Sequence, residues 1–419
     1  MRRLSLPALF LSCAVVSPAA AQDLAAAIGD ALDHAPAMAE ASAGQVAARA
    51  RVDRARAESN PLLKVEGSAG FGRIDNGGFF EFTADDTSPT ALQATAEYPL
   101  FAGGRIAAAI DQARGGAEIA KLQAEQVRLR TIVDAVTAYA DVLTSRRLVE
   151  RYRKLVNALT ETERQARLLF RSGTSASTEL AQARARKAEG DAGLAMAEGR
   201  LASAEARFER LTGKPAGTLA PLPLPPAIPP SLGIALDSAR VANPALKQAD
   251  KSVTVAKAGV RAAKAEGMPT IGAFAEAAHV RDQFFPGYRA DSVAAGVRGR
   301  WTLWAGGRVA AQTRAADADL TASEARARQA SQMVEGMVID AWQACQTAAR
   351  MVEASALRSS AAQEALRGTK LEAQVGAKPT LAVLDAEREA LEAEAADIEA
   401  QGMRLVAAYR LNALTGNIE

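Results

Sequence analysis

The sequence YPLFAGGR at residues 98–105 returns almost unchanged as WTLWAGGR at residues 301–308. The two copies are 301 − 98 = 203 residues apart. The same spacing relates two further pairs of landmarks: the glycines Gly173 and Gly376, and the Leu-Thr-Gly sequences at 211–213 and 414–416. Three landmarks in one register indicate an internal duplication, and this determines the architecture before any local pattern is considered.

The duplication continues upstream with a slightly larger spacing. Pro36 and Pro61 match Pro244 and Pro269 at 208 residues, so the second copy is 208 − 203 = 5 residues shorter between Pro269 and the WTLW sequence. A proline-rich stretch between the copies predicts an extended, semi-rigid linker. We therefore expect three parts: a first repeat at 22–213, a linker at 214–230 and a second repeat at 231–419.

Each copy contains two segments in which apolar and polar residues alternate, which is typical of strands. Each segment has about ten residues, the length that a tilted strand needs to cross a bilayer. Aromatic residues gather around their ends, as they do at membrane interfaces, although an ordinary soluble hairpin with an aromatic cluster is the alternative. The expected strands are 62–72 and 90–100 in the first copy, and 270–280 and 291–303 in the second.

Long segments without proline follow each strand pair. Apolar residues in them step by three and four positions, as in coiled coils. A helix of about 68 residues would be ~100 Å long and needs partners of matching length, which two half-length helices placed end to end provide. We expect long helices at 104–172 and 175–211 in the first copy, and at 307–375 and 380–414 in the second.

The first residues have the features of a secretory signal peptide, with Arg2 and Arg3, an apolar stretch and a small-residue cleavage site. We expect residues 1–21 to be removed, although Cys13 leaves lipidation as a weaker alternative. Cys345 is then alone and cannot form an internal disulfide.

After the signal peptide there is no run of about 18 apolar residues, so the sequence predicts no transmembrane helix. A net charge of +2 gives no reason to expect nucleic-acid binding.

Four strands per chain cannot close a transmembrane sheet, and an open strand edge is not tolerated in lipid. If the strands cross a membrane, several chains must therefore combine. Two, three or four chains would give 8, 12 or 16 strands, as multiples of the four strands expected in the sequence. Because each strand pair leads directly into long helices, such an assembly would form a duct.

The duplicated plan, the AGGR junctions and the Leu-Thr-Gly endings resemble the TolC-like outer-membrane efflux protein family over nearly the whole chain. The resemblance implies a mainly α fold in which a homotrimer forms a 12-stranded β-barrel continuous with a 12-helix α-barrel. It implies a passive channel in the cell outer membrane, with a periplasmic tunnel, for efflux or type I secretion. A periplasmic adaptor protein and an inner-membrane transporter of RND or ABC type would be its partners.

The resemblance also assigns residues to the helix turns. In the family an acidic residue of the first copy pairs with a basic residue of the second to close the periplasmic tip, and the turns meet the adaptor. The implied gate residues are Thr178, Glu179, Lys378 and Asp385, and the implied docking residues are Gly173, Val375 and Gly376. Ala382 and Ala373 stand where the family has an aspartate and a tyrosine, so the strength and selectivity of the gate stay open.

The strand-to-helix junctions supply the remaining candidates. Their glycines suit a sharp change of direction, and their aromatic residues suit a membrane interface. These residues are Tyr98, Phe101, Gly103, Gly104, Trp301, Trp304, Gly306 and Gly307.

No catalytic, cofactor or metal-binding constellation is present in the sequence. His34 and His279 are far apart and have no ligand spacing around them. The Ala-Gly-Gly stretch at 102–104 is not a phosphate loop, because no Gly-Lys-Ser/Thr follows it. We therefore expect a transport component without a cofactor, and not an enzyme. A periplasmic adaptor or coiled-coil scaffold protein without a pore is the alternative, and the cargo is not indicated.

Overall fold

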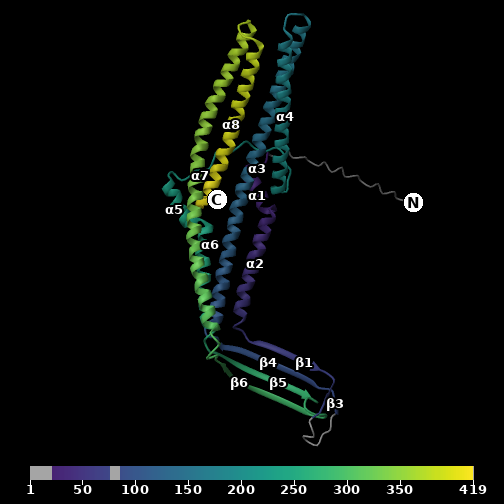
Figure 1. The fold of residues 1–419 in the computed structure, drawn as a ribbon, viewed down its shortest axis with the longest axis vertical. Coiled ribbons are helices and arrows are strands. Elements are labelled where there is room, and N and C mark those ends of the chain that lie inside the picture. Colours follow the sequence, from purple (N-terminus) through teal and green to yellow (C-terminus); the bar gives the residue numbers. More distant parts are fainter. Residues whose placement is uncertain (1–20, 76–84, 419) are drawn as a thin grey trace, which may run out of the picture. The chain divides into compact units, whose positions relative to one another are not determined.

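The computed structural model describes residues 21–75 and 85–418 (Figure 1). The expected signal peptide, residues 1–21 with Cys13, lies outside the described residues apart from Ala21. Within the described ranges, no helix is both long enough and apolar enough to span a bilayer.

The helices follow the duplicated plan of the sequence. In the first repeat they are α1 (Leu24–His34), α2 (Pro36–Ala57), α3 (Arg105–Arg171) and α4 (Ser177–Thr212). In the second they are α5 (Leu232–Ala242), α6 (Pro244–Ala265), α7 (Arg308–Gln374) and α8 (Thr380–Thr415). Proline causes the same break in both copies, because the residue before it leaves the helical region: Ala35 and Asn243 both have extended backbones.

The strands form one antiparallel sheet and one small ribbon. The main sheet has the order β1 (Leu62–Ala69), β4 (Thr90–Phe101), β5 (Thr270–Arg281) and β6 (Arg289–Arg300), so that β1 and β6 are its edges (Figure 1). The ribbon pairs β2 (Gly72–Ile74) with β3 (Asp85–Thr87). Strands of the two repeats meet where β4 pairs with β5.

Two expected strands are too long. The strand expected at 62–72 ends at Ala69, which pairs with Thr90, the first residue of β4. Pro89 precedes Thr90 and has no backbone N–H for a ladder, so pairing stops there and Phe71 lies outside any strand. The strand expected at 291–303 ends at Arg300, because its partner β5 begins at Thr270. Trp301 is therefore also outside the sheet.

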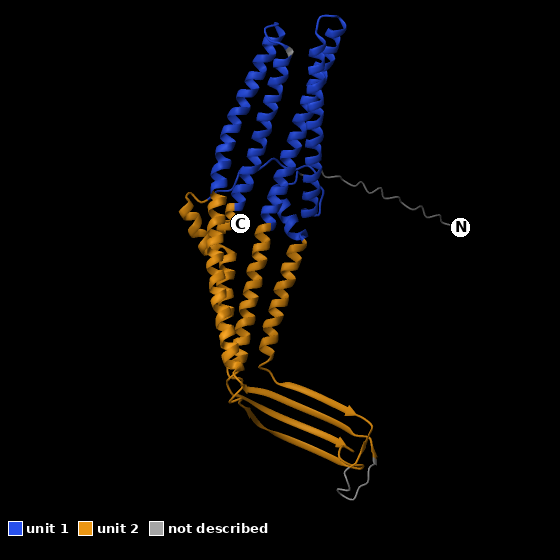
Figure 2. Ribbon diagram, in the orientation of Figure 1, with its two compact units in different colours: residues 1–35, 131–228, 343–410 blue, residues 36–130, 229–342, 411–419 orange. Residues whose placement is uncertain are grey.

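The chain divides into two compact units that do not coincide with the two repeats (Figure 2). Unit 1 comprises residues 1–35, 131–228 and 343–410, and unit 2 comprises 36–130, 229–342 and 411–419. Each unit takes segments from both copies. The long helices α3 and α7 each contribute one part to each unit.

The core of unit 1 contains the fully buried Tyr139, together with Val136 and Phe208. The Tyr139 hydroxyl donates hydrogen bonds to the backbone oxygens of Gln22, at 3.1 Å, and Ala220, at 2.7 Å. Gln22 and Ala220 also bond to each other through the backbone at 2.9 Å. One buried tyrosine of α3 thus anchors both the start of the described chain and the proline-rich linker.

Unit 2 contains the sheet, α2, α5 and α6. The amide Nδ2 of Asn243, between α5 and α6, donates to the backbone oxygen of Leu414 at 3.0 Å. Gly416 follows α8 with a φ of +77°, and a Cβ there would lie 2.4 Å from the Cβ of Ala242. The Leu-Thr-Gly ending therefore needs its glycine both for the left-handed backbone and for close packing on α5.

Candidate functional site

The two hairpin turns have the same backbone geometry. Gly173, with a φ of +76°, donates its N–H to the oxygen of Phe170, and Thr174 donates to Leu169 at 2.9 Å. Gly376, with a φ of +75°, and Ala377 make the equivalent bonds to Ala373 and Glu372. Both turns are Schellman caps, in which glycine supplies the left-handed residue. Val375 beside the second turn is 80% exposed.

The predicted gate residues lie at these turns, but Glu179 and Lys378 do not meet within one chain. Glu179, in the first turn of α4, accepts a hydrogen bond from the Ser175 hydroxyl. The Lys378 Nζ lies 2.7 Å from a carboxylate oxygen of Glu372, on α7 of its own hairpin. Thr178 is exposed. The predicted pairing of Glu179 with Lys378 therefore remains a prediction about neighbouring chains.

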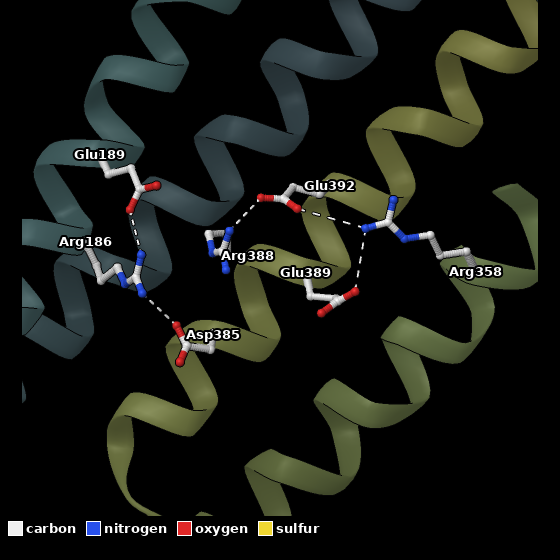
Figure 3. A network of polar contacts seen from close by, with 7 residues as sticks. All are labelled: Arg186, Glu189, Arg358, Asp385, Arg388, Glu389 and Glu392. Atoms are coloured by element: carbon white, nitrogen blue, oxygen red, sulfur yellow. Dashed lines mark hydrogen bonds and ion pairs between the residues drawn. The ribbon is translucent and has the colours of Figure 1, made fainter.

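The fourth gate residue, Asp385, is paired across the two repeats (Figure 3). Nη2 of Arg186 on α4 lies 2.8 Å from Oδ1 of Asp385 on α8. Nη1 of Arg186 lies 2.9 Å from Oε2 of Glu189. The hydrogen bond with Glu189, followed by the charge of Asp385, raises the pKa of the Arg186 guanidinium. Sequence reasoning missed Arg186, although it lies one helical turn beyond Gln182, the counterpart of Asp385 at a spacing of 203.

Neighbouring charges on α8 pair within the second repeat. Arg358 of α7 lies 3.6 Å from Glu389 and 4.0 Å from Glu392, and Arg388 lies 3.0 Å from Glu392 (Figure 3). Glu389 is the counterpart of Arg186 at the spacing of 203. The first copy therefore places a cation where the second has an anion, and this cation forms the link between the copies.

Each hairpin also contains a nearly buried carboxylate between its two helices. In the second hairpin, Glu387 of α8 has a side chain only 8% exposed, and its Oε1 lies 2.8 Å from Nζ of Lys370 on α7. Its Oε2 is buried and has no hydrogen-bond partner in the structure. In the first hairpin, Glu163 of α3 is 13% exposed and pairs with both Arg167 and Arg184.

The spacing of 203 relates these two sites, with the charge inverted at one position and kept at another. It carries Arg184 onto Glu387 and Arg167 onto Lys370. The acid therefore lies on the first helix of one hairpin and on the second helix of the other. One acid has two cationic partners, whereas the other has one partner and a free oxygen.

The strand-to-helix junctions, in contrast, are held in the same way in both copies. Arg105, which ends the first AGGR sequence, lies 2.9 Å from Glu58, and Arg308 lies 2.8 Å from Glu266. Spacings of 203 and 208 relate these partners. The arginine of each AGGR sequence thus ties the start of the long helix to the end of the helix that precedes the strands.

The residues predicted at the junctions are four glycines with a left-handed backbone and four aromatic residues with exposed side chains. All four glycines have positive φ, from +60° at Gly103 to +90° at Gly104, with Gly306 at +61° and Gly307 at +81°. The four aromatic side chains are exposed, by 44% at Tyr98, 49% at Phe101, 61% at Trp301 and 85% at Trp304. Trp301 donates its indole N–H to the backbone oxygen of Gly267 at 3.2 Å.

The sheet has one apolar and one polar face. Its register places Val65, Ala94, Ala277 and Val293 directly side by side across the four strands. The next row on the opposite face reads Lys64, Thr95, Glu276 and Ala294. The large apolar side chains of the first face are exposed to differing degrees; they are Leu63, Val65, Leu92, Tyr98, Ile271, Val293 and Val297. Within the part of the chain that the structure describes, this apolar surface is therefore left uncovered.

The two histidines show no metal-site geometry. His34 packs against Gly213 at the end of α4, and His279 on β5 bonds to Asp291 on β6. Among the residues that the structure describes, no group of three or more potential ligands is arranged to hold a metal.

A family model described as outer membrane efflux protein matches residues 27–214 and 235–417. The two matched segments correspond to the two repeats and leave out only the ends of the chain and a stretch around the linker. The chain belongs to the outer membrane efflux protein family. This family consists of TolC-like channels and not of enzymes, and the match to both copies decides against the adaptor or scaffold alternative.

Individual relatives agree with this assignment. The outer membrane efflux protein BepC of Brucella suis biovar 1 (strain 1330) is 29% identical over 290 residues, which are 69% of this chain and 63% of BepC. The chain therefore matches less than two thirds of that relative's length.

Solved structures show the same fold. The CmeC outer membrane channel of Campylobacter jejuni has a TM-score of 0.83 at 15% identity, with 94% of this chain and 86% of that chain covered. The outer membrane protein VceC of Vibrio cholerae has a TM-score of 0.78 at 20% identity, with 94% and 96% covered. The expected fold, with two repeats of a strand pair and a long helical hairpin, is thus confirmed.

Proposed function

We propose that this chain is one subunit of a homotrimeric exit duct in the outer membrane, with its helices forming a periplasmic tunnel. The observation that carries the proposal is the four-stranded sheet with one exposed apolar face and two open edges. Membership of the outer membrane efflux family and the likeness to CmeC, whose structure is described as an outer membrane channel, support it.

The edges of the sheet explain why several copies are needed. β1 and β6 have a paired neighbour on one side only, so each presents a row of backbone groups without ladder partners. Lipid offers these groups no hydrogen bonds, and each unsatisfied group costs several kcal/mol. Because all three pairings in the sheet are antiparallel, β1 and β6 run in opposite directions. β6 of one copy can therefore pair with β1 of the next and continue the antiparallel pattern.

Three copies would close twelve strands, as 3 × 4, into a ring with the apolar face toward lipid. As membership of the efflux family implies, the duct is passive, and its energy comes from an inner-membrane transporter of RND or ABC type. A periplasmic adaptor protein meets the hairpin turns at Gly173, Val375 and Gly376. The cargo would be expelled in efflux or in type I secretion.

Cysteine cross-linking of the two edges tests this proposal directly. Glu66 on β1 is replaced by cysteine and combined, one variant at a time, with a cysteine at each polar-face position of β6 between Ala290 and Arg298. Both natural cysteines, Cys13 and Cys345, are replaced by alanine. After oxidation in outer-membrane fractions, one register should give covalent dimers and trimers and nothing larger.

The matched control places the first cysteine at Gln93 on β4, directly opposite Glu66. β4 has strands of its own chain on both sides, so this control should stay monomeric. Absence of intermolecular products at every register, or a ladder that continues beyond three chains, would contradict the trimeric duct.

A further inference from the structure

A cavity of about 680 Å³ lies in unit 2 where α2 and α3 meet the sheet. Its volume falls within the ~300–1,000 Å³ typical of small-molecule sites. Residues from both repeats line it, including Arg54 of α2, Arg105 of α3, Phe274 of β5, and Arg298 and Arg300 of β6. The chain therefore builds this cavity only after the two copies pair through β4 and β5.

The charge of the cavity is positive. Four arginines and two glutamates line it, for a net charge of 4 − 2 = +2. Glu58 is engaged by Arg105 at 2.9 Å, and Glu97 lies 3.9 Å from Arg298, at the outer limit of an ion pair. In the part of the chain that the structure describes, Arg54 and Arg300 have no carboxylate partner. Guanidinium groups of this kind bind carboxylate, sulfonate and phosphate groups through paired hydrogen bonds.

Aromatic surface lies beside these cations. The Arg298 guanidinium carbon is 4.4 Å from the ring centre of Phe274, which fixes the guanidinium over the ring. Phe101 also lines the cavity. An occupant that joins an anionic group to an apolar body would match both halves of this surface.

We propose that the cavity binds anionic amphiphiles, and that it selects such molecules among those that leave through the duct. Arg298 and Arg300 alternate with the apolar positions of β6 and lie in the same face as Glu276, which is the polar face of the sheet. The role in selecting exported molecules rests on the proposed function, in which the apolar face meets lipid and the polar face lines the passage. Each of three subunits would contribute one such site.

The test measures binding of naphthalene-2-sulfonate to the purified full chain by calorimetry in an uncharged maltoside detergent, with detergent alone as the blank. The cation 2-naphthylmethylammonium has the same ring system and opposite charge. The wild-type protein should bind the sulfonate and not the cation. Replacing both free arginines, in R54Q/R300Q, should weaken sulfonate binding at least about tenfold, the lower end of what losing charge-assisted hydrogen bonds produces.

The matched control is R51Q/R289Q, which removes the same charge from the same helix and the same strand outside the cavity. Its affinity should stay within about twofold of the wild type, since distant exposed charges are screened. Three results would overturn the site: no sulfonate binding above the blank, equal binding of the cation, or equal losses in both double variants.

Conductance in planar bilayers, measured on the same preparations, separates this inference from the proposed function. A conducting wild type that does not bind the sulfonate overturns the anion site and leaves the duct intact. A protein that binds the sulfonate but never conducts keeps the site and overturns its role in selecting cargo.

Discussion

The two ends of the long hairpins differ in how closely the repeats agree. At the strand-to-helix junctions, both copies use the same glycines and the same pairing of arginine with glutamate, Arg105 with Glu58 and Arg308 with Glu266. At the tips, both copies keep the Schellman turn, but the buried acid changes helix, from Glu163 on α3 to Glu387 on α8.

This difference indicates which features both copies require. A junction must turn a strand into a helix in every copy, so its backbone and its ion pair are retained. The tip can vary its side chains as long as the turn keeps its glycine. Charges that differ between the copies let them bind each other, as Arg186 of the first copy, which stands where the second has Glu389, does with Asp385. The gate predicted at the tip would need such asymmetry between the two hairpins.

The largest expected effect tests how far the likeness of the junctions extends. In G103A, the new Cβ would lie 2.5 Å from the Cβ of Met268, whereas at the equivalent Gly306 a Cβ would meet nothing within 4 Å. Both variants lose ~1 kcal/mol from the left-handed backbone. Overpacking adds ~2 kcal/mol for G103A alone. The free energy of unfolding in urea, followed by helical circular dichroism, should fall by roughly 3 and 1 kcal/mol; equal losses would contradict the packing difference.

The next prediction concerns the two nearly buried acids of the hairpins, Glu163 on α3 and Glu387 on α8. K370M leaves the Glu387 carboxylate buried without its cation, and the loss should be ~2 kcal/mol, reduced from the fully buried case because Lys370 is 46% exposed. R184M leaves Glu163 paired with Arg167, so about 0.5 kcal/mol should be lost. The same unfolding measurement distinguishes them.

The control for this pair is the double variant K370M/E387L, which removes both charges. It should recover most of the stability that K370M loses, since no uncompensated charge stays buried. Failure to recover, or a loss in R184M as large as in K370M, would show that the uncompensated charge of Glu387 is not the source of the difference.

The third prediction concerns the link between the copies. If the Arg186–Asp385 contact favours the closed tip, R186Q should raise channel conductance in planar bilayers. An exposed pair contributes ~0–1 kcal/mol, and at a middle value of ~0.5 kcal/mol each, three pairs in a trimer give ~1.5 kcal/mol, an increase of about tenfold. R388Q breaks a contact within α8 only, with Glu392, and should leave conductance unchanged. An equal response of both variants would argue against Arg186 as a gate residue.

A smaller conductance change is expected for the predicted contact of Lys378 with Glu179 of a neighbouring chain. K378A and E179Q should each raise conductance by about threefold, because they remove the same exposed pair. E372Q removes the partner that Lys378 has within its own chain, at 2.7 Å, and should not raise conductance. Unchanged conductance in K378A would count against this contact.

The smallest effect is expected where the copies agree most. R105Q and R308Q break equivalent exposed ion pairs, so each should lower the free energy of unfolding by about 0.5 kcal/mol. A difference of more than about 1 kcal/mol between the two variants would show that the junctions are less alike than their geometry indicates.

The fold was predictable from the sequence because it repeats. The spacing of 203 identified the copies, and the absence of proline identified the long helices, as in α8, expected at 380–414 and found at Thr380–Thr415. Strand ends were less accurate, because they depend on where the partner strand begins. Phe71 and Trp301 continue the alternating pattern, but among the described residues neither is paired with another strand.

The side-chain contacts at the tips were not predictable in the same way. Pairing of Arg186 with Asp385 depends on how two helices are rotated toward each other, which a sequence pattern within one helix does not determine. Comparing the copies position by position could still have shown that Glu387 replaces Arg184. The AGGR arginines could have been matched to Glu58 and Glu266 by the same comparison, since both spacings were known.

The measurement that tests the account most directly is the native mass of the particle extracted from outer membranes in detergent. In the proposed duct, the edge strands β1 and β6 are paired by strands of other copies. We therefore expect a particle of three chains. Such a particle should also conduct in planar bilayers. A monomer or dimer, recovered without membrane association, would contradict the duct and leave the apolar face of the sheet to be explained by another partner.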